Sequence, residues 1–298
     1  MDAAQAAASS MVQDSGATEA TEALEIDLLL EAVFQRHGFD FRAFERMALR
    51  ARLLALMQAH GLATVSLLQD RVLHQSGMAA RLLRALSAAP AGMFDDAAHA
   101  RQLRAALQAA LHGAALPKVW LAECAGVEQA WSLAILLQEE QLLNRTEIFA
   151  TVAQEDMLAE AGAAPGAGTG TGGAGTPAER LAQYQQQYAA SGGSAALADY
   201  FDIKGGRAVL KAALRERIIW AQYNMATDAS FNEFDLIVCR RALADYGPQL
   251  RQRALRLFHD SLALFGVLGI DRVFERGDPL AAHYQPLFAQ QPWYKRVL

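Results

Sequence analysis

Residues 234–243 read Phe-Asp-Leu-Ile-Val-Cys-Arg-Arg-Ala-Leu, and they carry the strongest indication of the fold class. Its first part, Phe234–Cys239, is a nearly continuous apolar run of the length of one strand. Such a run is typical of a strand in a parallel sheet that is covered on both faces. The residues from Pro248 to Leu264 have helical periodicity, so we expect a strand followed by an amphipathic helix.

The same alternation extends over residues 113–298. A strand, a helix and a second strand in succession form a parallel crossover unit, and a series of them gives a doubly wound, Rossmann-like α/β domain. Within it we expect a small subdomain at about 196–217 and a flexible insertion over 162–177, which is almost entirely Gly, Ala, Thr and Pro. The other predicted elements are strands at 118–124, 147–152, 218–221 and 266–271, a helix at 129–140 and a helical pattern up to Ala161.

Residues 24–112 have a helical pattern, with apolar side chains such as Leu28, Leu29 and Val33 at helical spacing. They predict an N-terminal helical domain. Gly38 and Gly61 each follow a periodic run, at the position where a helix end favours a left-handed residue. Residues 1–23 are rich in Ala, Ser, Thr and acids, which predicts a disordered leader.

Composition excludes several classes of protein. The net charge is −5, and no stripe of Lys and Arg alternates with aromatic residues, so we expect no nucleic-acid partner. Apolar runs such as Leu133–Leu137 are far shorter than the roughly 20 residues of a membrane span. The N-terminus has no basic flank or apolar signal core, so we expect a cytoplasmic protein. The seven histidines are scattered, which argues against a metal site.

Two stretches resemble the CheR-type chemotaxis-receptor methyltransferases. Phe234–Leu243 is similar to the family's F-D-L-I-x-C-R-N-x-L, and Trp120–Ala134 follows the family's W-x-A-G-C-S-T-G-E-E-x-Y-S-L-A. The resemblance covers roughly residues 24–276. It implies a helical domain followed by a methyltransferase domain, S-adenosyl-L-methionine as cofactor, methylation of receptor glutamates and a chemoreceptor or chemosensory signalling protein as partner.

This chain departs from the family pattern at the positions that hold the cofactor. Glu123 and Val127 replace two glycines of the turn after the first strand, where a Cβ would obstruct the cofactor and, at Val127, restrict the backbone. Val152 replaces the acid that binds the ribose hydroxyls. The stretch 89–95 replaces N-x-T-x-F-F-R, so Ala89, Ala91 and Asp95 stand where the family has asparagine, threonine and arginine. Asp245 replaces a tyrosine, and Tyr246 lies one place further on.

What survives gives the candidate cofactor-binding residues. The resemblance assigns this role, vestigial or remodelled, to Gly126, Glu128, Asn224, Met225 and Arg241. It assigns no catalytic residue. Three acids, Asp95, Asp96 and Asp245, could gather near the same crevice, but nothing in the sequence supplies the tuned pKa that catalysis requires.

Other features leave alternatives open. Arg42, Arg46, Arg50 and Arg52 make one helix basic, and either Arg50 and Arg52 bind a partner or the row is a solvated face with local ion pairs to Glu45. Cys124 and Cys239 are either reactive thiols or core residues. The segment Trp293–Arg296 is either a strand packed on the domain or a docking peptide.

The sequence therefore supports more than one function, and whether the chain is an enzyme stays open. The first hypothesis is a CheR-like protein of chemosensory signalling that has lost or weakened S-adenosylmethionine binding and acts as a non-catalytic binding or regulatory protein. The second is an active S-adenosylmethionine-dependent protein-glutamate O-methyltransferase with a remodelled cofactor site. A third, for which Trp131, Trp220 and Arg241 are candidates, is a crevice that binds a different ligand.

Overall fold

A computed structural model describes residues 2–87, 91–153, 158, 175–275 and 277–298, with side chains in the first helix from residue 18 onward. The chain forms two compact units. The first contains the residues before position 89 together with Asp245–Leu250, and the second contains the rest. The predicted boundary at residue 112 therefore lies too late. The helix that precedes it, α5 (Ala97–Leu111), buries Leu103, Leu107 and Leu111 in the core of the second unit.

The first unit is a helical bundle. Its core contains Leu29 and Val33 of α1 and Leu53 of α2. Gly38 and Gly61 follow α1 and α2 with φ of 76° and 62°, which confirms the predicted helix ends. The Thr64 hydroxyl accepts a hydrogen bond from the Leu67 N–H and so caps α3. The helices are α1 (Asp2–His37), α2 (Arg46–Ala59), α3 (Val65–His74) and α4 (Met78–Leu86).

The predicted disordered leader differs from the structure, in which α1 begins at Asp2 and continues without a break to His37. Residues 2–23 contain many alanines and few strong helix breakers, so helix propensity favours the continuation.

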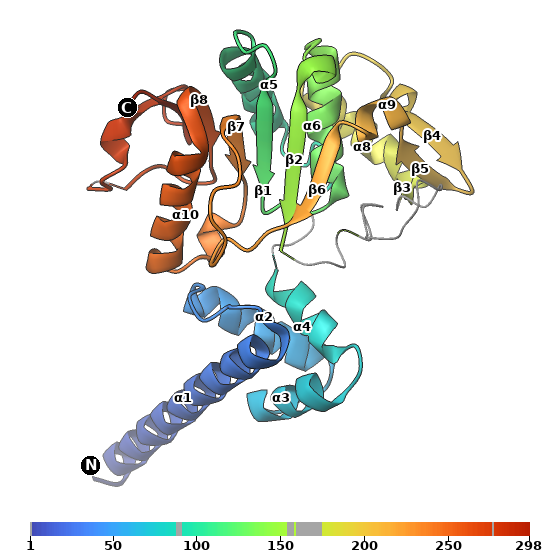
Figure 1. Cartoon of the computed structure of the whole chain (residues 1–298). Helices are drawn as coiled ribbons and strands as arrows, with labels where there is room; N and C mark the ends of the chain where they lie inside the picture. The colour runs from blue at the N-terminus through green and yellow to red at the C-terminus, as the bar shows by residue number, and fades with distance from the viewer. Residues whose placement is uncertain (1, 88–90, 154–157, 159–174, 276) are drawn as a thin grey trace. The chain divides into compact units, whose positions relative to one another are not determined.

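The second unit is built on a seven-stranded sheet with the order β6-β2-β1-β7-β8-β10-β9 (Figure 1). The first five strands in that order are parallel, and β10 pairs antiparallel with both β8 and β9. The strands are β1 (Lys118–Ala122), β2 (Glu147–Val152), β6 (Ile218–Gln222), β7 (Phe234–Cys239), β8 (Leu262–Gly269), β9 (Tyr284–Pro286) and β10 (Trp293–Arg296).

Successive side chains of β1 reach opposite faces of the sheet. Val119 and Leu121 belong to the core that also contains the apolar faces of α5 and α6 (Val127–Glu139). Trp120 lies between them and contacts Phe258 of α10 (Pro248–Ser261), with 5.5 Å between the ring centroids. Helices therefore cover both faces, which confirms the predicted doubly wound α/β fold.

Three predicted boundaries need correction. The helix predicted to Leu264 ends at Ser261, and the strand predicted at 266–271 begins at Leu262. The run Leu262–Phe265 is apolar and suits either element, so periodicity alone does not decide it. The last residues of the predicted insertion, Thr176–Pro177, form strand β3. The rest of that insertion and the pattern expected up to Ala161 lie outside the described residues, apart from Leu158 and Gly175.

The segment predicted as a small subdomain contains a β-hairpin, β4 (Phe201–Lys204) and β5 (Arg207–Leu210), followed by α9 (Ala212–Arg215). These strands join β3 in a separate three-stranded sheet with the order β3-β5-β4. Helix α8 (Leu181–Ala190) connects β3 to this hairpin and buries Tyr184 and Tyr188.

The segment Trp293–Arg296 is a strand of the main sheet, which matches the packed alternative rather than the docking peptide. Trp293 is almost fully buried, and its Nε1–H donates to Oε1 of Gln102 at 2.9 Å. Within the described part of the chain, no helix is both long enough and apolar enough to cross a membrane.

Candidate cofactor crevice

The sheet order places a topological switch point between β1 and β7. The chain proceeds from β1 to β2 on one side, while β7 lies on the other, and all three strands end at the same edge. Ligands of doubly wound sheets bind at such an edge. Gly126 and Glu128 follow β1, Asn224 and Met225 follow β6, and Arg241 follows β7. The structure therefore brings the ends that carry all the predicted cofactor residues to one edge.

The turn after β1 keeps a glycine-like backbone without its first glycine. Glu123 has a φ of 50°, and Gly126 has a φ of 153°. A left-handed conformation of a residue with a Cβ costs about 1 kcal/mol or more. The Cys124 N–H donates to the Thr151 carbonyl at 2.7 Å, and the Ala125 N–H donates to Oε1 of Gln129 at 2.9 Å. These bonds hold the turn in place.

Val127 plays a different part from the one predicted. It is the first residue of α6, and its half-buried side chain packs against the apolar core. It therefore neither strains the turn nor stands in the crevice. The backbone strain in this turn lies at Glu123, because that residue has the positive φ that glycine adopts easily.

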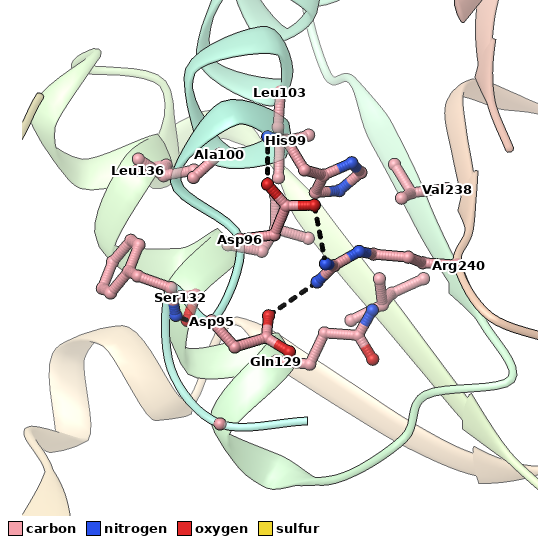
Figure 2. Close-up of a pocket in the computed structure, with 14 residues that line it drawn as sticks. Asp95, Asp96, His99, Ala100, Leu103, Gln129, Ser132, Leu136, Val238 and Arg240 are labelled. Carbon is pink, nitrogen blue, oxygen red and sulfur yellow. Dashed lines mark hydrogen bonds and ion pairs between the residues drawn. The ribbon is translucent and has the colours of Figure 1, made fainter. Parts of the chain in front are cut away.

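Ion pairs join the segment before α5 to the two arginines that follow β7. Asp95 lies 2.7 Å from Arg240 (Oδ1 to Nη1) and 2.5 Å from Arg241 (Oδ2 to Nη2). Asp96 also contacts Arg240, at 3.1 Å, so both carboxylates converge on one guanidinium (Figure 2). The side chains of Asp95 and Arg240 are only 17% and 14% exposed. Arg241, a predicted cofactor-binding residue, therefore forms an ion pair with Asp95 of the same chain.

The ion pairs border a small cavity of about 30 Å³. This volume accommodates roughly one or two water molecules, whereas sites for small-molecule ligands typically measure about 300–1,000 Å³. His99 lies in the wall, and burial together with the nearby charge of Arg240 lowers its pKa to about 4. The Ser132 hydroxyl accepts a hydrogen bond from the Phe94 N–H at 3.2 Å. Figure 2 shows Asp96, His99 and Arg240 gathered on one side of this cavity.

At the end of β2 stands Val152, which is 1% exposed. The polar groups nearby are used locally: the Thr151 hydroxyl accepts a bond from Nε1 of Trp120 at 2.9 Å. Asn224 forms a tight turn, because its Oδ1 accepts from the Ala226 N–H and its own N–H donates to Asp228, each at 2.9 Å. The neighbouring Met225 is buried. Thr151 and Asn224 therefore use these polar groups in hydrogen bonds within the chain.

Glu128 contacts Nη1 of Arg180 at 4.0 Å, and the Arg180 guanidinium lies 5.2 Å from the centroid of the Tyr184 ring. The Glu128 carboxylate therefore lies beside the cation of Arg180, the residue that directly precedes α8. The end of β2 presents the apolar side chain of Val152 in place of the acid that the resemblance implies. Asp95, with its ion pairs, stands where the resemblance implies an arginine.

The predicted acidic cluster and partner arginines are arranged differently from expectation. Asp245 groups with the helical unit, where it lies 2.6 Å from Arg52 (Oδ2 to Nη2), whereas Asp95 and Asp96 belong to the second unit. Arg52 also donates to the Leu86 carbonyl at 2.7 Å. Arg50 pairs with Glu22 of α1 rather than with Glu45. Tyr246 is buried, 5.1 Å from the Phe44 ring, so it is a packing residue.

Both cysteines are buried and free, and burial raises the pKa of each thiol, to about 12 at Cys124. Both are core residues, which matches the second of the two alternatives considered for them. Groups of three or more metal-ligating side chains are absent from the part of the chain that the structure describes.

Sequence reasoning missed the convergence of Asp95 and Asp96 on Arg240, and the role of His99. One signal was available: paired acids at 95–96 and paired arginines at 240–241 occupy two segments that the expected fold brings to the same edge. The left-handed φ of Phe94, Glu123 and Arg241, which are 51°, 50° and 73°, had no signal, because none of these residue types favours that conformation.

The fold and the edge geometry define a protein of the Rossmann-like methyltransferase class. Within it the chain belongs to the CheR methyltransferase family: residues 90–272 match the family's domain described as "CheR methyltransferase, SAM binding domain", and residues 24–87 match "CheR methyltransferase, all-alpha domain".

Named relatives agree with this family. The chain is 34% identical to "Putative methyltransferase Cher3" of Pseudomonas putida KT2440, over 82% of this chain and 86% of that protein. It is 28% identical to "Chemotaxis protein methyltransferase 1" of Pseudomonas aeruginosa PAO1, over 56% of this chain and 58% of that protein. Among solved structures, the N-methyltransferase NodS of Bradyrhizobium japonicum WM9 covers 69% of this chain and 88% of its own, with 12% identity and a TM-score of 0.34.

Proposed function

We propose that this chain is a degenerate CheR-family protein of chemosensory signalling that acts by binding and regulation rather than by methyl transfer, with lost or weakened affinity for S-adenosylmethionine. The observation that carries the proposal is the position of Asp95, which bridges Arg240 and Arg241 between the ends of β1 and β7. A cofactor that entered there would have to separate these ion pairs. By its family, the partner is a chemoreceptor or another chemosensory signalling protein.

The energetic argument rests on several small losses. Breaking a hydrogen-bonded ion pair that is largely shielded from water costs a few kcal/mol, and each missing polar contact to a ligand costs about 1–3 kcal/mol. Asp95 and Arg240 are shielded in this way, and Val152 can accept no hydrogen bond through its side chain. Because about 1.4 kcal/mol corresponds to one decade of affinity, these losses together lower the affinity by several decades.

Calorimetric titration with S-adenosylmethionine and S-adenosylhomocysteine tests the proposal. We expect no heat of binding up to millimolar ligand. Micromolar binding by the wild type that disappears in Asn224→Ala would overturn it, because Asn224 lies at the edge where the family binds its cofactor. The matched control is Asn232→Ala, a half-buried asparagine in the loop before β7, at the opposite end of that strand.

One observation favours the second candidate, an active protein-glutamate O-methyltransferase with a remodelled site. Glu123 keeps a left-handed backbone at a family glycine position, so the path of the turn survives the loss of the glycine. This reading requires Asp95 to move when the cofactor binds. Transfer of a radioactive methyl group to receptor glutamates, together with micromolar cofactor affinity, would establish it. A protein that binds receptor but neither cofactor nor methyl group supports the first candidate.

A further inference from the structure

A groove lies within the helical unit, between α1, the end of α2 and the start of α3. Three segments line it: α1 at four positions from Thr18 to Glu25, α2 at Leu54 and Met57, and the turn into α3 at Ala63–Val65. The groove has a volume of about 360 Å³, and sites for small-molecule ligands typically measure about 300–1,000 Å³. It is therefore large enough to hold a small ligand.

The lining of the groove is divided by chemistry. The α1 side carries hydroxyls and two carboxylates, Glu22 and Glu25, which lie three residues apart and hence on one face of the helix. Apart from the Thr64 hydroxyl, the α2 and α3 sides are apolar, and Leu54 among them is 36% exposed. A hydrocarbon chain that lay on Leu54 would remove this apolar surface from water. The groove therefore suits an amphipathic ligand.

The charge of the groove is negative. Among the described side chains that line it, two are acidic and none is basic. Arg50, which is outside the lining, forms an ion pair with Glu22 and offsets one of the two charges. Glu25 accepts a hydrogen bond from the uncharged hydroxyl of Ser66 in the first turn of α3. The partial charge of a helix N-terminus, about half an elementary charge, offsets only part of the Glu25 carboxylate. The groove therefore attracts a single positive charge.

Hydrogen-bond acceptors accompany this charge. Oγ1 of Thr64 accepts a bond from the Leu67 N–H at 3.2 Å, and a hydroxyl oxygen has a second lone pair. Thr18 and Thr21 bring two further hydroxyls to the lining. A primary ammonium group has three donors and no acceptor, so it matches carboxylate and hydroxyl oxygens. The Glu25 carboxylate would repel an anionic ligand.

We propose that this groove is a binding site for a small organic monocation, whose primary ammonium group pairs with Glu25 and whose short apolar chain lies on Leu54 and Met57. Such a ligand bridges α1 to α2 and α3, so its binding stabilises the contacts of residues 18–25 with the rest of the bundle. Because the groove lies wholly in the helical unit, the proposal stands whether or not the second unit binds a cofactor.

The test uses three probes of equal chain length: hexylammonium, hexanol and hexanoate. Titration of the full chain is followed by the NMR signals of the methionine methyl groups, with Met57 in the groove and Met47, elsewhere on α2, as internal reference. We expect hexylammonium to shift the Met57 signal and to bind about fivefold more tightly than hexanol, since an ion pair near the surface contributes up to about that factor. Hexanoate is expected not to bind. Equal affinities for the three probes, or no shift at Met57, would overturn the proposal.

Two variants and a matched control locate the site. Glu25→Gln is expected to lower the affinity for hexylammonium about fivefold, to that for hexanol, and to leave hexanol binding unchanged. Ala63→Phe places a ring in the groove at an exposed position and is expected to abolish binding of both probes. Asp70→Asn removes one negative charge of α3 outside the lining and is expected to bind like the wild type. Circular-dichroism melts verify that each variant folds. Equal losses in Glu25→Gln and Asp70→Asn, or wild-type binding by Ala63→Phe, would refute the proposal.

Hydrogen exchange provides a second readout that needs no variant. Ile26 is the first buried side chain of α1 that the structure describes, and polar contacts, such as that of Arg46 with the Ala23 carbonyl at 2.6 Å, attach the residues before it. Saturating hexylammonium is expected to slow amide exchange in residues 18–25 of the wild type and to leave residues 26–37 unchanged, because the core already anchors them. Binding that leaves exchange in residues 18–25 unaltered would show that the ligand does not contact α1, contrary to the proposal.

Discussion

Asp95 and Arg241 form an ion pair, with 2.5 Å between Oδ2 and Nη2, at two positions where the family resemblance places an arginine and an asparagine. The arginine that the family carries before the first helix of the α/β domain is an acid here, and a second guanidinium, that of Arg241, follows Arg240 at the end of β7. The two substitutions are therefore complementary in charge.

A double-mutant cycle measures this pair. Asp95→Asn should lower the free energy of unfolding by about 1–3 kcal/mol, because the well-shielded Arg240 then keeps only the more exposed Asp96 as its carboxylate partner. The coupling between Asp95→Asn and Arg241→Gln should be smaller, about 1 kcal/mol, since the Arg241 side chain is 39% exposed. Urea denaturation of the four proteins gives both values. A coupling of zero would mean that the pair contributes nothing to stability.

Reversal of the substitutions tests whether they account for the weak cofactor binding that we propose. The variant Asp95→Arg, Arg241→Asn, Val152→Asp restores the side chains of the family pattern at three positions. We expect its affinity for S-adenosylhomocysteine to exceed that of the wild type by at least about tenfold, as one regained polar contact supplies about a decade. Calorimetry measures the affinity, and a circular-dichroism melt verifies the fold. An unchanged affinity in a folded variant would mean that other features close the site.

Backbone strain at Glu123 predicts a stabilising substitution. Glycine adopts a φ of 50° without cost, so Glu123→Gly should raise the free energy of unfolding by about 1 kcal/mol relative to Glu123→Ala. The alanine variant is the appropriate reference, because it loses the same carboxylate but keeps the Cβ and its strain. Thermal and urea denaturation measure the difference. If the two variants are equally stable, the left-handed backbone at this position is not strained.

His99 predicts a pH dependence of stability. Burial, followed by the charge of Arg240, lowers its pKa to about 4, below the value near 6.5 of an unfolded chain. The folded state thus favours neutral imidazole. The contribution of His99 is fully present above about pH 6.5 and is lost as the pH falls from there to about 4, since only the unfolded state takes up the proton.

The corresponding variant is His99→Gln. Its free energy of unfolding should fall less than that of the wild type between pH 7.5 and pH 4.5, with a difference of about 1–3 kcal/mol because His99 is only partly shielded from solvent. His74→Gln, at an exposed histidine on α3, is the control for the loss of an imidazole. Parallel curves for the wild type and His99→Gln would contradict the assignment of neutral imidazole.

Two arginines of α2 predict unequal effects. Arg52→Ala leaves Asp245, whose side chain is 14% exposed, without its cation and also removes a donor from the Leu86 carbonyl. We expect a loss of about 1–3 kcal/mol of unfolding free energy. Arg50→Ala breaks only the exposed pair with Glu22 and should cost less than about 1 kcal/mol. Urea denaturation in the same buffer compares them, and equal losses would indicate that burial of Asp245 is unimportant.

The sequence predicted the strands best where the apolar runs are longest. Strands β2 and β7 match their predicted limits residue for residue, because loops with polar or turn-forming residues bound each run. The end of α10 was wrong, since Leu262–Phe265 suits a helix as well as a strand. The ion pairs of Glu22, Asp27 and Glu31 in α1 were missed because their partners lie 11–28 residues away in the chain. A local sequence pattern does not indicate ion pairs between residues so far apart.

The sequence predicted where the candidate site lies, but not which side-chain contacts form there. The family pattern and the parallel order place Gly126, Asn224 and Arg241 at one edge, and this follows from strand directions alone. That Asp95 closes the crevice depends on side-chain orientations across two segments about 145 residues apart. The sequence motif placed Val127 in the crevice, but a motif position does not tell which side of helix α6 a residue occupies. In the structure the Val127 side chain packs against the core.

The segment Asp245–Leu250 has a consequence for how such a protein can be divided or recombined. The chain leaves the α/β unit at this segment, contributes Tyr246 and Gly247 to the helical bundle and then returns. Tyr246 bridges to Phe44, and the Gly247 N–H donates to the Ala43 carbonyl at 2.9 Å, an approach so close that a Cβ at position 247 would lie 2.7 Å from that oxygen. A gene fragment that ends before position 89 therefore encodes an incomplete bundle. Exchange of the bundle between homologues therefore requires three crossover points, one after position 88 and one on each side of Asp245–Leu250, and the inserted segment must keep Gly247.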